Sequence, residues 1–163
     1  MADNKLAERA TQRASSLDPR ADTEARRVSD RVPVGSTRAS ANRKVLIIDD
    51  DEAILATLGA YLESAGITVL TSNTPFGATN LLTRERPRVV LLDVDMPGLS
   101  GDALIKNILA RAGIPRSEIT IFFHSGQSAT DLSRLTRECG LDGYIEKKGA
   151  PSEVLATVLR CLG

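Results

Sequence analysis

The sequence lacks tryptophan, has a single histidine, His124, and contains only two cysteines in 163 residues. A lone histidine excludes a multi-histidine zinc site. Cys139 and Cys161 have no metal-like spacing, so we expect reduced thiols and a cytoplasmic location. Lysine plus arginine equals aspartate plus glutamate, at 21 each. Because the net charge is zero, we expect no direct nucleic-acid partner and no large anionic-membrane surface.

Long apolar stretches are missing as well. No run approaches the ~18 apolar residues of a bilayer-spanning helix, so we expect no membrane insertion. The charged N-terminus, MADNKLAERATQR, has no apolar region typical of a secretory signal. Residues 1–42 contain no aromatic residue and few large aliphatic ones, so they can bury little surface. We therefore predict a disordered or weakly helical N-terminal tail over 1–42 and one folded domain over 43–163.

From residue 43 onward, short apolar runs alternate with segments of helical character. The runs, which we interpret as buried parallel strands, cover 45–48, 67–70, 89–92, 119–123 and 143–145. The segments predicted to be helices cover 52–65, 75–86, 101–112, 128–139 and 152–162. Ser152 is predicted to cap the last helix. Five strand–helix units in this order predict an α/β fold with a doubly wound, five-stranded parallel sheet.

The stretch KVLIIDDDEAIL, residues 44–55, places acids directly after an apolar strand. Asp49, Asp50 and Asp51 follow one another, and close like charges oppose folding unless something compensates them. We interpret Asp51 as the N-cap of the first helix, because aspartate there accepts from free backbone N–H groups. A divalent metal ion would compensate the charge of the other two carboxylates.

Further polar residues follow the other strands of the predicted sheet. Asp93 and Asp95 come after the third strand, Ser125 ends the fourth, and Lys147 follows the fifth. Ligands of doubly wound sheets bind at these carboxyl ends. Mg²⁺ takes about six oxygen ligands, a phosphoryl group needs cations and hydrogen-bond donors, and an aspartate can act as nucleophile. The pattern predicts Mg²⁺-dependent phosphoryl transfer onto an aspartate.

The motifs VLIIDDDE, VVLLDVDMPGLSG, FFHSG and GYIEKK together resemble the response-regulator receiver domain of two-component signal transduction. The resemblance covers residues 44–163 and implies the (βα)5, flavodoxin-like fold of the chemotaxis regulators. It implies that Asp93 is the phosphoacceptor. It also implies that Asp50 and Asp93 hold Mg²⁺ directly with the backbone carbonyl of Asp95, while Asp49 acts mainly through water.

The same resemblance implies roles for three residues on the last two strands. Ser125 matches the switch hydroxyl, Lys147 the phosphate-pairing lysine, and Tyr144 the aromatic switch residue. Members of this family receive the phosphoryl group from the histidine of a histidine kinase or a histidine phosphotransfer protein. They are not enzymes in the ordinary sense, because they catalyse only their own phosphorylation and slow dephosphorylation.

Family members then repack the face formed by the fourth helix, the fifth strand and the fifth helix. We expect this face to bind a downstream protein or a second copy of the chain. The sequence ends directly after the last predicted helix. We therefore expect no C-terminal effector domain and an output through protein–protein contact.

The sequence departs from the family at two positions and leaves two alternatives open. Lys148 stands where the family usually has a proline after a cis bond, and His124, which we interpret as buried and hydrogen-bonded, stands where an apolar residue is commoner.

A degenerate receiver that binds partners without phosphorylation is one alternative. The other is a haloacid-dehalogenase-type phosphohydrolase, which also uses an Asp-x-Asp motif. That family, however, has the motif after its first strand and does not have a proline at the position of Pro97.

Overall fold

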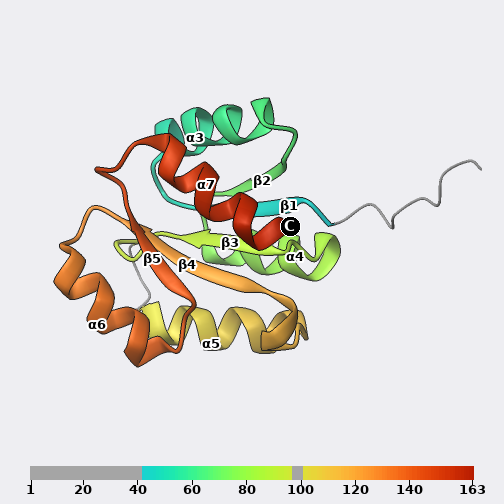
Figure 1. The fold of residues 1–163 in the computed structure, drawn as a ribbon. Helices are drawn as coiled ribbons and strands as arrows, with labels where there is room; N and C mark the ends of the chain where they lie inside the picture. Colours follow the sequence, from blue (N-terminus) through green and yellow to red (C-terminus); the bar gives the residue numbers. More distant parts are fainter. Residues whose placement is uncertain (1–41, 97–100) are drawn as a thin grey trace, which may run out of the picture. The chain divides into compact units, whose positions relative to one another are not determined.

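The computed structural model describes residues 42–96 and 101–163, and these contain a five-stranded parallel sheet (Figure 1). The strands are β1 (Lys44–Ile48), β2 (Thr68–Ser72), β3 (Val89–Leu92), β4 (Thr120–Ser125) and β5 (Gly143–Glu146). Their order in the sheet is β2-β1-β3-β4-β5. The α/β prediction is confirmed. The predicted tail lies outside the described residues except for residue 42.

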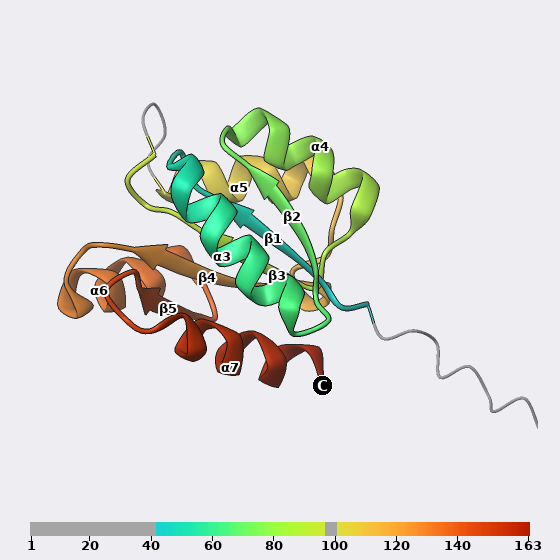
Figure 2. The same ribbon diagram turned by 90° about the horizontal axis from the view of Figure 1, so that it is seen from above.

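Helices cover both faces of this sheet (Figures 1 and 2). They are α3 (Glu52–Ser64), α4 (Pro75–Glu85), α5 (Gly101–Ala112), α6 (Ala129–Cys139) and α7 (Pro151–Leu162), with a short 3-10 helix, η1 (Arg116–Glu118), before β4. One hydrophobic cluster joins the sheet to α3 and α7, and a second joins it to α4, α5 and α6. None of the described helices is long and apolar enough to cross a membrane.

The central strands are apolar at successive positions because both of their faces are covered. In β1, Val45 and Ile47 pack in the cluster with α3 and α7, while Leu46 and Ile48 pack in the opposite cluster. Successive strand residues point to opposite faces, so a strand between two helical layers needs no polar face. In contrast, Thr68 and Thr71 of β2 are exposed, because β2 is an edge strand.

The predicted cap of the last helix is wrong. α7 begins at Pro151, its N-cap residue is Ala150, and no side chain there bonds to the helix. Ser152 lies inside the first turn. Proline is well suited to the first helical position because its missing N–H would be unpaired there anyway. The proline therefore sets the start of α7 one residue earlier than predicted.

Candidate functional site

Backbone hydrogen bonds bring the polar residues after the strands to one edge of the sheet. The N–H of Asp93 donates to the carbonyl of Ile48 at 2.9 Å, and the N–H of Asp49 donates to the carbonyl of Ser72 at 3.1 Å. The N–H of Lys147 likewise donates to the carbonyl of Ser125 at 2.9 Å. These bonds continue the parallel ladders just past the strands, so the side chains start from fixed positions at this edge.

Three carboxylates converge there. Asp49, Asp50 and Asp93 each contribute an oxygen, and these oxygens lie within 4.8 Å of one another. Asp49 is 0% exposed and Asp93 is 3% exposed, whereas Asp50 is open to solvent. Carboxylate oxygens at this spacing, with one side open to water, suit a hard divalent cation such as Mg²⁺. The residues present therefore fit the metal that the acidic stretch predicts.

The two buried carboxylates are also held by backbone donors. Asp49 Oδ1 accepts from the N–H of Asp51 at 3.0 Å, and Asp93 Oδ1 accepts from the N–H of Asp95 at 3.2 Å. The Asp51 side chain accepts from the N–H groups of Ala53 and Ile54, at 2.8 and 3.4 Å. The predicted N-cap role of Asp51 is confirmed, and its carboxylate is directed at the helix.

Lys147 connects the two buried carboxylates. Its Nζ lies 2.7 Å from Asp93 Oδ2 and 2.8 Å from Asp49 Oδ2. Burial lowers the pKa of the Lys147 ammonium, but the hydrogen bonds and charges of the two aspartates outweigh this effect and raise the pKa above its ordinary value. Lys147 is therefore charged at neutral pH. It reaches both carboxylates although Lys148 follows it and the described residues contain no cis peptide bond.

A second group of side chains forms around Ser125, which is completely buried. Its hydroxyl donates to Asp95 Oδ2 at 2.8 Å and accepts from the N–H of Gln127 at 3.2 Å. The Gln127 amide donates to the other Asp95 oxygen at 2.7 Å. The Asp95 carboxylate therefore lies with Ser125 and Gln127. Gln127 could not be identified from the sequence, because a glutamine in a short loop resembles any exposed polar residue.

The remaining predicted residues lie close by. Tyr144 is half-buried on β5 and packs against the cluster of α4, α5 and α6. His124 is 6% exposed, so its predicted burial is confirmed, but its Nδ1 has no hydrogen-bond partner among the described residues. Burial lowers the pKa of His124, and the Lys147 charge lowers it further, against smaller opposing effects of Asp49 and Asp93. His124 is therefore neutral at pH 7.

The sequence matches the response regulator receiver domain over residues 45–159, and the chain belongs to this family. The transcriptional regulatory protein PrrA of Mycobacterium tuberculosis is 30% identical over 115 residues, which are 71% of this chain and 48% of PrrA. The regulator PhoP of Bacillus subtilis is 30% identical over 117 residues, which are 72% of this chain and 47% of PhoP. This chain thus spans about half the length of these curated relatives.

Similar stretches occur in a sensor and in isolated receiver structures. The sensor protein GacS of Pseudomonas syringae is 28% identical over 82% of this chain and 15% of its own length. A CheY-like receiver from Methanospirillum hungatei has a TM-score of 0.63 at 25% identity, covering 73% of this chain and 92% of that chain. The receiver of Klebsiella pneumoniae RstA, solved in a BeF3-activated form, has a TM-score of 0.63 at 26% identity. The match covers 73% of this chain and 97% of that chain. The five-stranded fold of this chain is therefore that of a receiver domain.

Proposed function

We propose that this receiver domain accepts a phosphoryl group on Asp93 from the phosphohistidine of a histidine kinase or phosphotransfer protein. The observation that carries the proposal is the convergence of three carboxylates and one ammonium group. Asp49, Asp50 and Asp93 place oxygens within 4.8 Å of one another, and Lys147 Nζ lies 2.7 Å from Asp93. A site built only for stability would not gather three acids around one lysine, because their mutual repulsion opposes folding.

In the transfer, a carboxylate oxygen of Asp93 forms a bond to phosphorus as the bond from phosphorus to the donor imidazole breaks. The imidazole leaves with the bonding electron pair and takes a proton from solvent. Asp50 and Asp93, with Asp49 close by and the backbone carbonyl of Asp95, would hold Mg²⁺, which would supply positive charge for the phosphoryl group. Positioning and electrostatic stabilisation provide most of the rate in such reactions, so the chain needs no separate general base.

Lys147 supplies the second positive charge. Its ammonium already lies between Asp93 and Asp49, so we expect it to pair with a phosphoryl oxygen on Asp93. The acceptor loses its carboxylate charge when the acyl phosphate forms, while the phosphoryl group brings two negative charges of its own. Lys147 thus remains bound to the modified residue instead of being released by it.

Ser125 and Tyr144 provide the switch in this proposal. The Ser125 hydroxyl donates to Asp95 in the structure, and a phosphoryl oxygen on Asp93 offers a stronger acceptor for the same proton. Exchange of that bond would release Asp95 and draw the end of β4 toward the acceptor. Tyr144 lies on the adjacent strand β5, so its packing would respond. The face of α6, β5 and α7 would then bind a downstream protein or a second copy.

Acetyl phosphate and Mg²⁺, followed by intact-mass spectrometry, test this function. We expect the wild-type chain to gain one phosphoryl mass and Asp93→Asn to gain none. Asp51→Asn is the matched control, because it removes a neighbouring acid at the β1–α3 junction but keeps a capping side chain and leaves all three converging carboxylates in place. Undiminished labelling of Asp93→Asn would refute the assignment. An unlabelled wild type would favour the phosphorylation-independent module, and repeated release of phosphate from organic esters would favour the hydrolase.

A further inference from the structure

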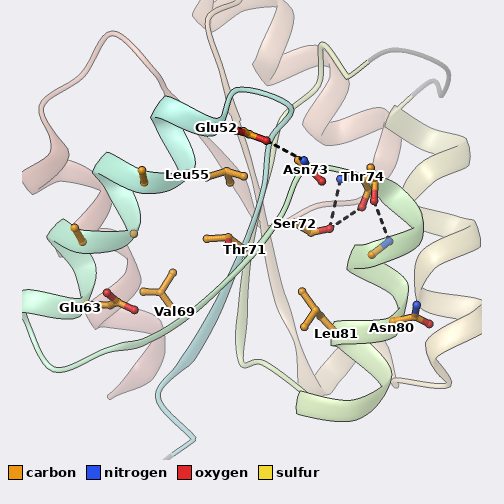
Figure 3. Close-up of a pocket in the computed structure, with 14 residues that line it drawn as sticks. Glu52, Leu55, Glu63, Val69, Thr71, Ser72, Asn73, Thr74, Asn80 and Leu81 are labelled. Carbon is orange, nitrogen blue, oxygen red and sulfur yellow. Dashed lines mark hydrogen bonds between the residues drawn. The ribbon is translucent and has the colours of Figure 1, made fainter.

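A groove runs along β2, the outer strand of the sheet, between α3 and α4 (Figure 3). It has a volume of about 770 Å³. Small residues make it hollow: Ala56, Gly59 and Ala60 line it from α3, and Gly77 lines it from α4. A Cβ built on Gly59 would meet only Val69 Cγ1 and Thr71 Cγ2, at 3.8 and 3.9 Å. The floor of the groove is therefore the backbone and the side chains of an edge strand.

Backbone groups of β2 face this groove. The N–H of Thr68 donates to Arg43 in front of β1, and the carbonyl of Ser72 accepts from Asp49 behind it. In a parallel ladder, alternate residues direct both backbone groups to the same neighbour. Thr68, Leu70 and Ser72 thus bond toward β1. The N–H and C=O groups of Val69 and Thr71 then point away from the sheet, into the groove, and offer a template for another strand.

Acidic side chains stand at the two ends of the groove. Positions 52, 55, 56, 59, 60 and 63 form one face of α3, with Glu52 and Glu63 at its ends and small or apolar residues between them. Figure 3 shows both glutamates beside the groove, with Glu52 near Asn73. Among the lining residues that the structure describes there is no lysine or arginine. The charge of the groove is therefore negative on the α3 side.

The length of this face matches a short strand. Glu63 follows Glu52 by eleven positions, which corresponds to ~16 Å along the axis of α3. A strand advances ~3.3 Å per residue, so the first and fifth residues of an extended segment lie ~13 Å apart, and long basic side chains can reach the remaining ~3 Å. In such a strand the first, third and fifth side chains would point toward α3, and the second and fourth toward Leu81 and Asn80 of α4.

We propose that the β2 groove binds an extended basic segment of a partner protein, which adds as a sixth strand to the sheet. The segment has a Lys or Arg at its first and fifth positions, opposite Glu52 and Glu63, and a small residue at its third position, opposite Ala56 and Gly59. Apolar residues at the second and fourth positions cover Leu81. Backbone bonds to Val69 and Thr71 supply affinity, and the alternating side chains supply specificity. This binding does not depend on the phosphorylation of Asp93.

The test uses the full chain labelled with ¹⁵N and an acetylated, amidated peptide whose central residues are Lys-Val-Ala-Val-Lys. This pattern reads alike in both directions, so it allows parallel and antiparallel pairing. We expect saturable shifts of the Val69 and Thr71 amide signals and slower hydrogen exchange at both N–H groups. Three comparison peptides each carry one change. The first has backbone N-methyl groups, the second has glutamates in place of the lysines, and the third has leucine in place of the alanine. Each should bind at least about fivefold more weakly, because each loses one source of recognition.

Variants of the chain give the reciprocal test. The double variant Glu52→Gln with Glu63→Gln should bind the lysine peptide more weakly. We expect the affinity to fall by about two- to fivefold per charge removed. The exposed Glu118→Gln on η1 is the matched control and should bind as the wild type does. Gly59→Leu should block binding by filling the groove, and its melting curve shows whether the fold persists. Equal binding of the N-methylated or glutamate peptide, or no shift at millimolar lysine peptide, would overturn the proposal. Concentration-dependent shifts at Val69 and Thr71 without peptide would overturn the proposed occupant in favour of a second copy.

Discussion

The two strand–helix junctions at the acidic edge of the sheet are built in opposite ways. Between β1 and α3 the chain carries three aspartates, and Asp51 caps the helix through two backbone N–H groups. Between β5 and α7 it carries Lys147 and Lys148, and no side chain caps the helix. Local hydrogen bonds hold the first junction in place. The second has no side-chain cap, and its Lys147 is held across the sheet by ion pairs with Asp49 and Asp93.

The β5–α7 junction is also more tightly constrained in its backbone than its sequence suggests. The N–H of Gly149 donates to the carbonyl of Glu146 at 3.0 Å. A Cβ at position 149 would lie 2.5 Å from Glu153 Oε2 and 3.3 Å from the Glu146 carbonyl. A glycine therefore lets the chain turn closely after Lys147. The comparison teaches that an acidic junction can be fixed locally, while its basic counterpart depends on the acids that it neutralises.

The largest expected effect comes from removing the charge that joins the two junctions. Lys147→Met keeps much of the side-chain volume but leaves the buried Asp49 and Asp93 without their cation. We expect the free energy of unfolding at pH 7 without Mg²⁺ to fall by about 3 kcal/mol, because an uncompensated buried charge is costly. Urea denaturation measures it. Lys148→Met, on the exposed neighbour, should change stability by less than about 0.5 kcal/mol. Equal effects of the two substitutions would show that the ion pairs do not fix the junction.

The next prediction distinguishes Asp50 from Asp51 at the first junction by their effect on the response to Mg²⁺. A ligand that binds only the folded state adds about 1.4 kcal/mol of stability at ten times its Kd. Mg²⁺ should therefore raise the melting temperature of the wild type and of Asp51→Asn. It should not raise that of Asp50→Asn, which loses a direct ligand but, with less repulsion, should be at least as stable without metal. A metal response that survives in Asp50→Asn and disappears in Asp51→Asn would place the ligands one residue later.

The local cap of the first junction should contribute somewhat less. Asp51→Ala removes the acceptor for Ala53 and Ile54, and we expect a loss of about 1 kcal/mol in the free energy of unfolding. Asp51→Asn should stay close to the wild type, because asparagine caps helices about as well. Denaturation of the three proteins side by side measures the difference. If alanine and asparagine behaved alike, the cap seen in the structure would have no energetic weight.

The smallest expected effect is a gain at the second junction. Ala150 occupies the N-cap position of α7 with extended backbone angles, φ −70° and ψ 143°, and is exposed. Ala150→Ser should supply the missing side-chain acceptor and raise the free energy of unfolding by about 0.5 kcal/mol. Ser152→Ala, inside the first turn, should not lower the free energy of unfolding by as much as the loss of an N-cap would. If Ser152→Ala lowered the free energy of unfolding and Ala150→Ser did not raise it, Ser152 would be the N-cap after all, as predicted from the sequence.

The order of the strands and helices was predictable, because apolar runs and helical periodicity are local signals. The run at 89–92 coincides with β3, and 101–112 coincides with α5. The exposure of β2 was not predictable, since an edge strand differs from a central one only in its neighbours. Gln127 was missed for the same reason: its partner Asp95 lies 32 positions away. The position of the Lys147 ammonium also depends on residues far away in sequence, Asp49 and Asp93. The site roles inferred from the resemblance stay predictions.

Reductive trapping of the phosphorylated chain tests the central claim most directly. Borohydride reduces an acyl phosphate to an alcohol and would convert a phosphorylated aspartate to homoserine, which peptide mass spectrometry locates. After treatment with acetyl phosphate and Mg²⁺, we predict homoserine at position 93 and unmodified aspartate at positions 49, 50 and 95. Homoserine at any of those three positions with Asp93 unchanged, or no reduced residue in a chain that carries a phosphoryl mass, would contradict the account.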